Sequence, residues 1–175
     1  SNAAVSAMTV TLSNGTVVNI AAGATSGSTP VLAPSDDVYV DAGSVSATIA
    51  TTSGGGFEAV TIDPAAATTA ITDTVDATTA TLTATPSVAE GGTITWTVSL
   101  NAPVTGSAVT VTLAGGQVIT IPVGASSGTA SGVAPDNVHA GGNAVTNSIA
   151  SASGGNFEQL TPNTAPVTTT VTDDG

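Results

Sequence analysis

The chain has 175 residues, of which 41% are hydrophobic. It contains twelve acidic residues and no lysine or arginine. The formal net charge is -12 at pH 7; because phosphate binding depends on lysine and arginine, nucleic acid and anionic membrane surfaces are excluded as partners. Cysteine is absent, which excludes disulfides and thiolate metal sites, and no apolar run reaches the roughly 20 residues needed for membrane insertion.

The composition favours a packed β-protein over a disordered chain. Disorder combines high net charge with low hydrophobicity, whereas this chain is rich in apolar residues. Those residues are mostly aliphatic and alternate with threonine, a mixture that fits the pleated surface of a sheet. The core must therefore be aliphatic, because the chain has only four aromatic residues: Tyr39, Phe57, Trp96 and Phe157.

The first three residues, Ser1-Asn2-Ala3, resemble the remnant of a cleaved expression tag. The rest of the chain repeats itself at an interval of about 100 residues. Residues 8–12 (MTVTL) correspond to residues 109–113 (VTVTL), and residues 54–58 (GGGFE) to residues 154–158 (GGNFE). We expect a partial immunoglobulin-like repeat over residues 4–75, with the last five strands, and a complete repeat of seven strands over residues 76–175.

The first repeat lacks a counterpart of residues 80–100 and so begins at its third strand. This N-terminal truncation leaves open sheet edges and half-covered apolar faces. We expect a second chain, through a homodimer or through strand exchange, to cover this edge.

The second repeat shows period-two alternation of apolar residues, which predicts β-strands. The expected strands cover residues 80–84, 94–100, 109–113, 119–121, 129–133, 145–149 and 167–171. Asn14-Gly15 and Gly115-Gly116 stand where a two-residue hairpin turn requires positive φ. The pattern predicts an all-β fold of tandem immunoglobulin-like β-sandwich domains, with Trp96 on a buried face.

Acidic residues cluster at the predicted strand ends. In an up-and-down reading of the strands, Glu90, Asp136 with Asn137, and Asp173 with Asp174 project from one pole. Carboxylates within about 4 to 6 Å of each other repel by roughly 1 to 4 kcal/mol per pair, and no fixed cation is present to offset this. Oxygen ligands without histidine or cysteine select a hard ion, so Ca²⁺ is expected. The alternative is that these carboxylates are ordinary solvated surface charges.

Three runs resemble the extender repeats of giant LapA-type RTX adhesins: residues 71–76 (ITDTVD), 83–92 (TATPSVAEGG) and 153–158 (SGGNFE). The acidic pattern is also similar to that of the calcium-binding Calx-β module. The resemblance implies a bacterial cell-surface adhesin exported by type I secretion, with roles in adhesion and biofilm. In that family neighbouring repeats form a rod between a surface anchor and distal ligand-binding domains, and calcium at the junctions stiffens the rod.

Carried over by position, the resemblance assigns calcium ligands to both repeats. The first repeat departs from the pattern at Thr74, which stands where the second has Asp174, and Asn137 replaces the second aspartate of a pair. The implied ligands are Glu90, Asp136, Asp173 and Asp174 in the second repeat, and Asp36, Asp37, Asp73 and Asp76 in the first.

The recurring Gly-rich turns end in a phenylalanine, expected to plug the core, and a glutamate, expected to be exposed. An alternative for Glu158 is that it holds a junction ion together with Asp76. Tyr39 and His139 occupy equivalent positions near a corner between sheets, where a tyrosine can bond to the backbone. The replacement of tyrosine by histidine argues against an essential role for this position.

Three function classes follow from these residues. A spacer fits the repetition best, because copies add reach. A calcium-dependent carbohydrate- or ligand-binding sandwich is the alternative. An enzyme is not expected, because a chain with no cysteine, lysine or arginine and one histidine offers only a carboxylate pair for catalysis.

Overall fold

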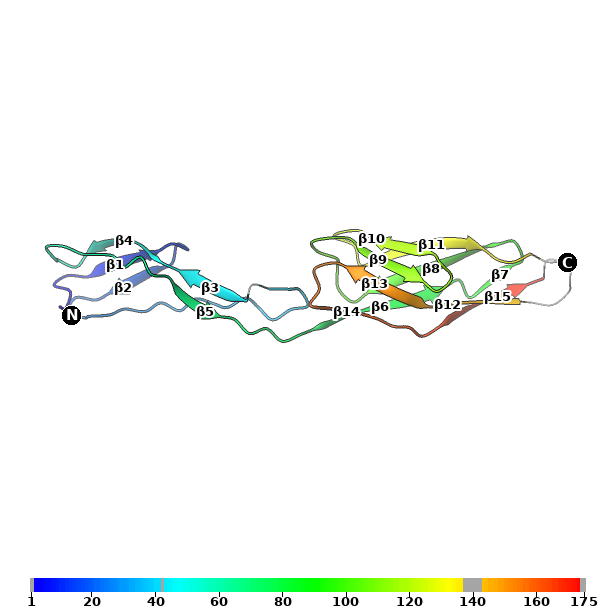
Figure 1. Ribbon diagram of the computed structural model, residues 1–175, viewed down its shortest axis with the longest axis horizontal. Helices are drawn as coiled ribbons and strands as arrows, with labels where there is room; N and C mark the ends of the chain where they lie inside the picture. Colours follow the sequence, from blue (N-terminus) through cyan, green and yellow to red (C-terminus); the bar gives the residue numbers. More distant parts are fainter. Residues whose placement is uncertain (1, 42, 137–142, 174–175) are drawn as a thin grey trace. The chain divides into compact units, whose positions relative to one another are not determined.

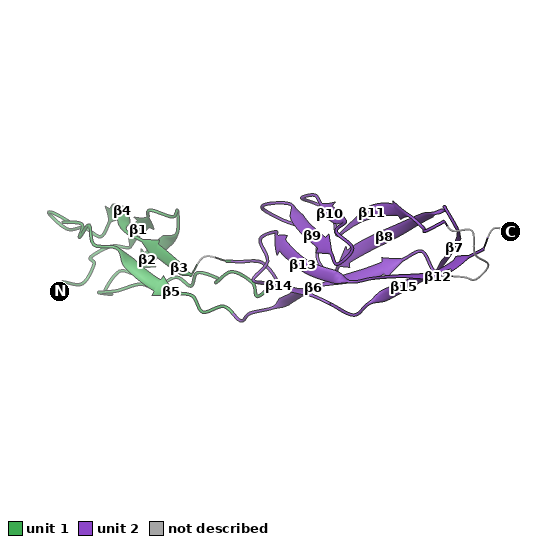
Figure 2. Ribbon diagram, turned by 45° about the vertical axis from the view of Figure 1, so that its right-hand side comes forward, with its two compact units in different colours: residues 1–36, 41–73 green, residues 37–40, 74–175 purple. Residues whose placement is uncertain are grey.

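The computed structural model describes residues 2–41, 43–136 and 143–173, and these residues form an all-β fold without helices (Figure 1). The chain divides into two compact units, which are coloured separately in Figure 2. Unit 1 comprises Ser1–Asp36 and Asp41–Asp73, and unit 2 comprises Asp37–Val40 and Thr74–Gly175. The segment Asp37–Val40 is therefore part of unit 2, although in the sequence it belongs to the first repeat.

Unit 1 has two antiparallel sheets with the strand orders β2-β1-β4 and β3-β5. Its core is small, since Ala4, Met8 and Val10 are its buried hydrophobic residues among those described. The alternation of Met8 and Val10 with threonine explains why β1 forms a strand with one buried face. The strands are Met8–Leu12 (β1), Val17–Ile20 (β2), Ser44–Ala47 (β3), Ile49–Gly54 (β4) and Ala67–Ala70 (β5).

Unit 2 has three sheets in a sandwich-like arrangement, with the strand orders β11-β8-β6-β14, β10-β9-β13 and β12-β15-β7. Two pairs are parallel, β14 with β6 and β15 with β7. The strands are Ala77–Ala84 (β6), Ser87–Ala89 (β7), Thr93–Leu100 (β8), Val109–Leu113 (β9), Val118–Ile121 (β10), Ser127–Val133 (β11), Asn143–Asn147 (β12), Ile149–Gly154 (β13), Gln159–Pro162 (β14) and Val167–Thr172 (β15).

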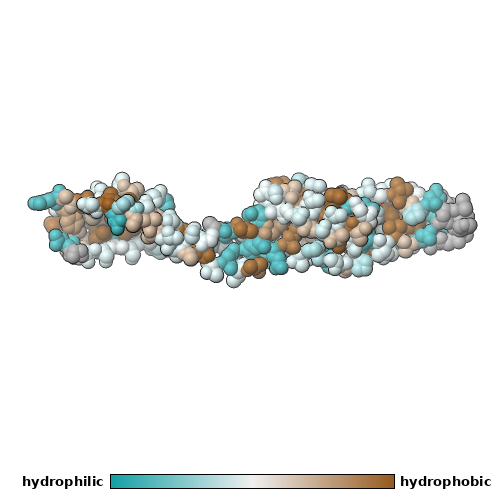
Figure 3. All heavy atoms as spheres, in the orientation of Figure 1, coloured by the Kyte–Doolittle hydropathy of each residue, from teal (hydrophilic) through white to brown (hydrophobic). Residues whose placement is uncertain are grey.

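The core of unit 2 is aliphatic, as the composition predicts. Buried valine, leucine and isoleucine side chains come from all three sheets and surround Trp96, which is 3% exposed. The opposite strand faces carry threonine and serine, so most of the visible surface in Figure 3 has near-neutral hydropathy. A sheet with one apolar and one polar face buries its apolar face by packing against another sheet.

The predicted strand over residues 145–149 is wrong in one respect. Ser148 separates two strands, because β12 ends at Asn147 and pairs with β15, whereas β13 begins at Ile149 and pairs with β9. The chain thus passes from one sheet to another at this residue. Val145, Asn147 and Ile149 keep the inward alternation, so the apolar period gives no sign of the break.

The two predicted hairpin turns also differ from the expectation. Only the second residue of each pair has positive φ, at 84° in Gly15 and 88° in Gly116. The amide of Gly116 donates to the carbonyl of Leu113, and the amide of Leu113 donates to that of Gln117, each at 2.8 to 2.9 Å. This is a three-residue loop with a glycine bulge, a common hairpin form that needs one left-handed residue and not two.

Candidate functional site

Three strand ends meet at one end of unit 2. The amide of Glu90, directly after β7, donates to the carbonyl of Thr172 at the end of β15 (2.9 Å). The amide of Ala134, directly after β11, donates to the carbonyl of Gly92 (2.8 Å). Glu90 is the donor of this first bond, and Asp173 directly follows the acceptor Thr172, so the two acidic residues lie on adjacent backbone segments.

Asp136 approaches the same turn. Gly91 has a φ of +67°, and a Cβ placed on it would lie 3.8 Å from Oδ2 of Asp136. Glu90 is buried, at 6% exposure, whereas Asp136 and Asp173 are exposed. The structure thus brings the predicted residues Glu90, Asp136 and Asp173 to one end of the sandwich.

This end offers oxygen ligands, but the side chains do not form a closed cage. Among residues 2–41, 43–136 and 143–173, no group of three or more acidic, histidine or cysteine side chains is arranged to hold a metal ion. Asp174, Asn137 and His139 lie outside the described residues. The donors present are carboxylates and backbone carbonyls, which match calcium in chemistry; a bound ion would have to draw them closer together.

Glu158 organises the opposite end of unit 2. Its Oε2 accepts a hydrogen bond from the amide of Asp76 (2.6 Å), and its own amide donates to the carbonyl of Val38 (3.1 Å). Glu158 therefore meets Asp76 through the Asp76 backbone. Glu158 is half-buried and not exposed as expected, whereas its counterpart Glu58 is exposed.

The four acidic residues assigned to the first repeat fall in different units. Asp36 and Asp73 belong to unit 1, whereas Asp37 and Asp76 belong to unit 2. Oδ1 of Asp37 accepts a hydrogen bond from the amide of Tyr39 (2.8 Å). This is the local turn that an aspartate side chain forms with the backbone two residues later. In unit 2, Asp37 therefore shapes the backbone beside Tyr39.

Tyr39 packs on Phe157 in unit 2, a contact that sequence reasoning missed. The two rings stack with centroids 5.6 Å apart and an angle of 24° between their planes. The Tyr39 hydroxyl donates to the carbonyl of Pro103 (2.8 Å), and the amide of Val40 donates to that of Asn156 (3.1 Å). A tyrosine bond to the backbone was anticipated; the partner, 64 residues away, was not.

The sequence comparisons point to one family. A model of the LapA domain matches residues 1–74 and matches again over residues 76–174. Searches of curated proteins and of solved structures gave no significant match. Within the part of the chain that the structure describes, no helix is long and apolar enough to cross a membrane.

Proposed function

The chain belongs to the LapA domain family, an adhesin-type family without enzymes, and from this premise we propose that it is a tandem pair of extender repeats in a secreted adhesin. The observation that carries the proposal is the twofold match, which covers nearly the whole chain in two successive segments. A cell-surface location fits the family. Type I secretion and a role in biofilm are part of the proposal.

The pairing of strands supports one repeated immunoglobulin-like fold. The order β2-β1-β4 in unit 1 corresponds to β10-β9-β13 in unit 2, and β3-β5 corresponds to β12-β15. The registers agree as well, since Met8 faces Ile20 as Val109 faces Ile121. Among the described residues, unit 1 has no strand that corresponds to β6, β7 or β8, nor one that corresponds to β11 or β14. We therefore propose that it is an incomplete copy of the repeat.

Unit 1 has a hollow in its apolar face, which we attribute to the absence of these strands. It has a volume of about 340 Å³ and includes Leu12, Leu32 and Val45 in its lining; the Leu32 side chain is 93% exposed. We propose that a second chain covers this face by dimerisation or strand exchange. Analytical ultracentrifugation over a range of concentrations tests this, and a monomer with a well-folded unit 1 at every concentration would count against it.

Calcium is the proposed stiffening agent. Its ligands are proposed to be Glu90, Asp136, Asp173 and Asp174 in the second repeat, with Asp36, Asp37, Asp73 and Asp76 serving the first. At ten times a millimolar-range Kd, each site would add about 1.4 kcal/mol to the free energy of unfolding. Mg²⁺ should substitute poorly, because it demands tight octahedral geometry.

Calorimetric titration with Ca²⁺ tests this function, followed by thermal unfolding with and without chelator. Replacing Glu90 by Gln together with Asp136 by Asn should weaken binding and remove the calcium-dependent rise in Tm. Asp63→Asn is the matched control, because Asp63 is an exposed acidic residue outside the ligand set, whose Oδ1 accepts the amide of Ala65. Absence of binding at millimolar Ca²⁺ would rule the mechanism out.

A further inference from the structure

In unit 2, the segment Asp37–Val40 forms an isolated antiparallel bridge with the chain around Phe157. The amide of Val40 donates to the carbonyl of Asn156, and the amide of Glu158 donates to the carbonyl of Val38, which pairs Tyr39 with Phe157 in antiparallel fashion. We call Asp37–Val40 the corner segment, and Pro103 with residues 156–158 the Phe157 corner. This arrangement combines backbone pairing with one side chain seated against a ring, as in strand-addition recognition.

Unit 1 contains the same corner, built from equivalent parts. A Cβ placed on Gly55 would lie 2.8 Å from the Phe57 ring, and one on Gly155 would lie 2.7 Å from the Phe157 ring. Each glycine has positive φ, so each ring is held in the same way against the turn that precedes it.

The backbone beside the ring is also equivalent. Ala4 exchanges hydrogen bonds with Gly23 and Ala24 in unit 1, as Val104 does with Gly124 and Ala125 in unit 2. Ala3 therefore corresponds to Pro103, whose carbonyl accepts the Tyr39 hydroxyl. We call Ala3 with residues 56–58 the Phe57 corner.

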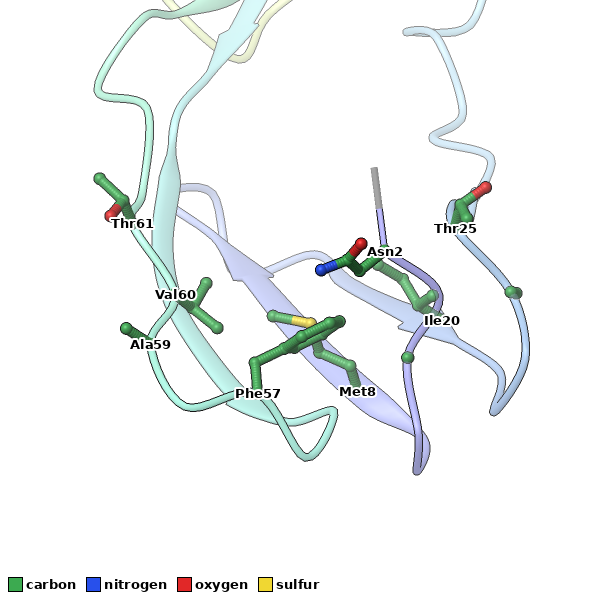
Figure 4. Close-up of a pocket in the computed structure, with 10 residues that line it drawn as sticks. Asn2, Met8, Ile20, Thr25, Phe57, Ala59, Val60 and Thr61 are labelled. Atoms are coloured by element: carbon green, nitrogen blue, oxygen red, sulfur yellow. The ribbon is translucent and has the colours of Figure 1, made fainter.

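The two corners differ in what covers them. Phe157 lies under Tyr39 and is 9% exposed, whereas Phe57 is only half-buried. Beside Phe57 lies a hollow of about 350 Å³, whose lining includes Met8, Ile20 and Val60 (Figure 4). Among the described residues, the Glu58 amide and the Gly56 carbonyl form no backbone hydrogen bond of the kind seen at the Phe157 corner.

We propose that the Phe57 corner is a docking site for the corner segment of a preceding copy of this repeat. The occupant would pair its backbone with Gly56 and Glu58, stack its aromatic ring on Phe57, and donate a hydrogen bond to the backbone carbonyl at position 3, an acceptor that any residue there provides. The chain itself identifies this occupant, because its own corner segment fills the equivalent site at Phe157.

The sequence provides one segment and one corner per repeat. Residues 36–39 (DDVY) recur as residues 136–139 (DNVH). His139, which replaces the tyrosine, also has an aromatic ring and an N–H group that can donate a hydrogen bond. A segment that fits the next copy and a corner that fits the previous one make a head-to-tail contact, which propagates along an array and does not close into a dimer. The inference goes beyond the proposed spacer role, since it requires no calcium.

The test is to add a peptide of residues 34–41 (PSDDVYVD) to the full chain and follow backbone amide signals by NMR. We expect the signals of residues 56–58 to shift, and those of residues 156–158 to stay in place because the chain's own segment covers them. The same peptide with Tyr39→Ala should cause no shifts. The chain with Phe57→Ala should lose the response.

A tethered version guards against weak binding in solution. Joining the same eight residues to Ser1 through a flexible Gly-Ser linker raises the effective concentration to about the millimolar range, and docking should slow hydrogen exchange of the Glu58 amide. Unchanged exchange in the tethered chain, or shifts confined to residues 156–158 with the free peptide, would overturn the proposal. Running both arms with and without chelator separates this site from the proposed calcium function.

Discussion

Asn147 is one of the few buried polar side chains described in unit 2, at 4% exposure. Its Oδ1 accepts the amides of Gly115 (2.9 Å) and Ser148 (3.0 Å), and its Nδ2 donates to Oε1 of Gln117 (2.9 Å). One side chain thus ties the β9–β10 turn to the point where the chain leaves β12 for β13. In unit 1 the equivalent position is Ala47, so this brace is particular to unit 2.

Replacing Asn147 by Ala should lower the free energy of unfolding of unit 2 by about 1 to 3 kcal/mol, because the amides of Gly115 and Ser148 lose their part-buried acceptor. Urea unfolding followed by the fluorescence of Trp96, the only tryptophan, measures this unit specifically. Gln117→Ala is the matched control and should lower the free energy of unfolding less. The Gln117 side chain is half-buried, and only its Oε1 takes part in this hydrogen-bond network. Equal losses in the two variants would contradict this account.

Tyr39 contributes a ring and a hydroxyl that two substitutions can separate. Tyr39→Phe keeps the stacking on Phe157 but leaves the Pro103 carbonyl without its donor, so we expect a loss of about 0.5 to 1.5 kcal/mol in unit 2. Tyr39→Ala also removes the stacking of the two rings. This should increase the loss of stability by about 0.5 to 1.5 kcal/mol, in addition to the effect of the buried apolar area that is lost. Val40→Ala, at an exposed neighbour, should leave the Trp96 transition nearly unchanged.

At the scale of elements, the pairing of β8 with β11 depends on a residue without a side chain. A Cβ placed on Gly132 would lie 2.9 Å from two atoms of the Trp96 ring. The ring is rigid and belongs to the buried core, and protein interiors are close-packed. Glycine at this position therefore leaves room for the six-membered part of the Trp96 ring beside β11.

Gly132→Ala should accordingly destabilise unit 2 by about 1 to 3 kcal/mol through overpacking. It should also shift the emission of Trp96 as the ring is displaced. Ser131→Ala changes the adjacent, exposed residue of the same strand and should do neither. Thermal unfolding and fluorescence spectra of the two variants provide the comparison, and an unperturbed Gly132→Ala protein would show that the ring can give way.

Strands with strict alternation were predictable from the sequence, and β9 over Val109–Leu113 has the predicted bounds. β14 was not predicted, because Gln159–Pro162 is short, does not alternate clearly and ends in proline. Its formation depends on a parallel neighbour, β6, that lies about 80 residues away in the chain. Local patterns carry no information about such a partner.

In the candidate site, too, some features could be predicted from local sequence patterns and others could not. Glu90, Asp136 and Asp173 could be placed at one end because an up-and-down reading of the predicted strands puts the loops and the strand end that carry them at the same pole. The corner segment could not be assigned to unit 2, because Tyr39 reads locally as part of the first repeat. Its partner Phe157 was visible only as a recurring core residue.

For the whole molecule, charge is the dominant electrostatic feature. With a net charge of -12 and no lysine or arginine, self-repulsion opposes the compact state. Raising NaCl from about 0.01 M to about 1 M shortens the Debye length from roughly 30 Å to roughly 3 Å, so the Tm should rise. KCl should give the same rise at equal ionic strength, and CaCl₂ a larger one if ions bind. A Tm that falls with NaCl would refute the argument.

The parallel pairing of β15 with β7 has a mechanical consequence. β7 lies near the start of unit 2 and β15 at its end, and their residues pair in register from Thr170 with Ser87 to Thr172 with Ala89. A pulling force on the two ends of this unit runs along both strands in opposite directions. It therefore loads the hydrogen bonds between them together, in shear, and does not open them one after another like a zipper. We therefore expect unit 2 to yield to tension only when several hydrogen bonds between β7 and β15 break at once.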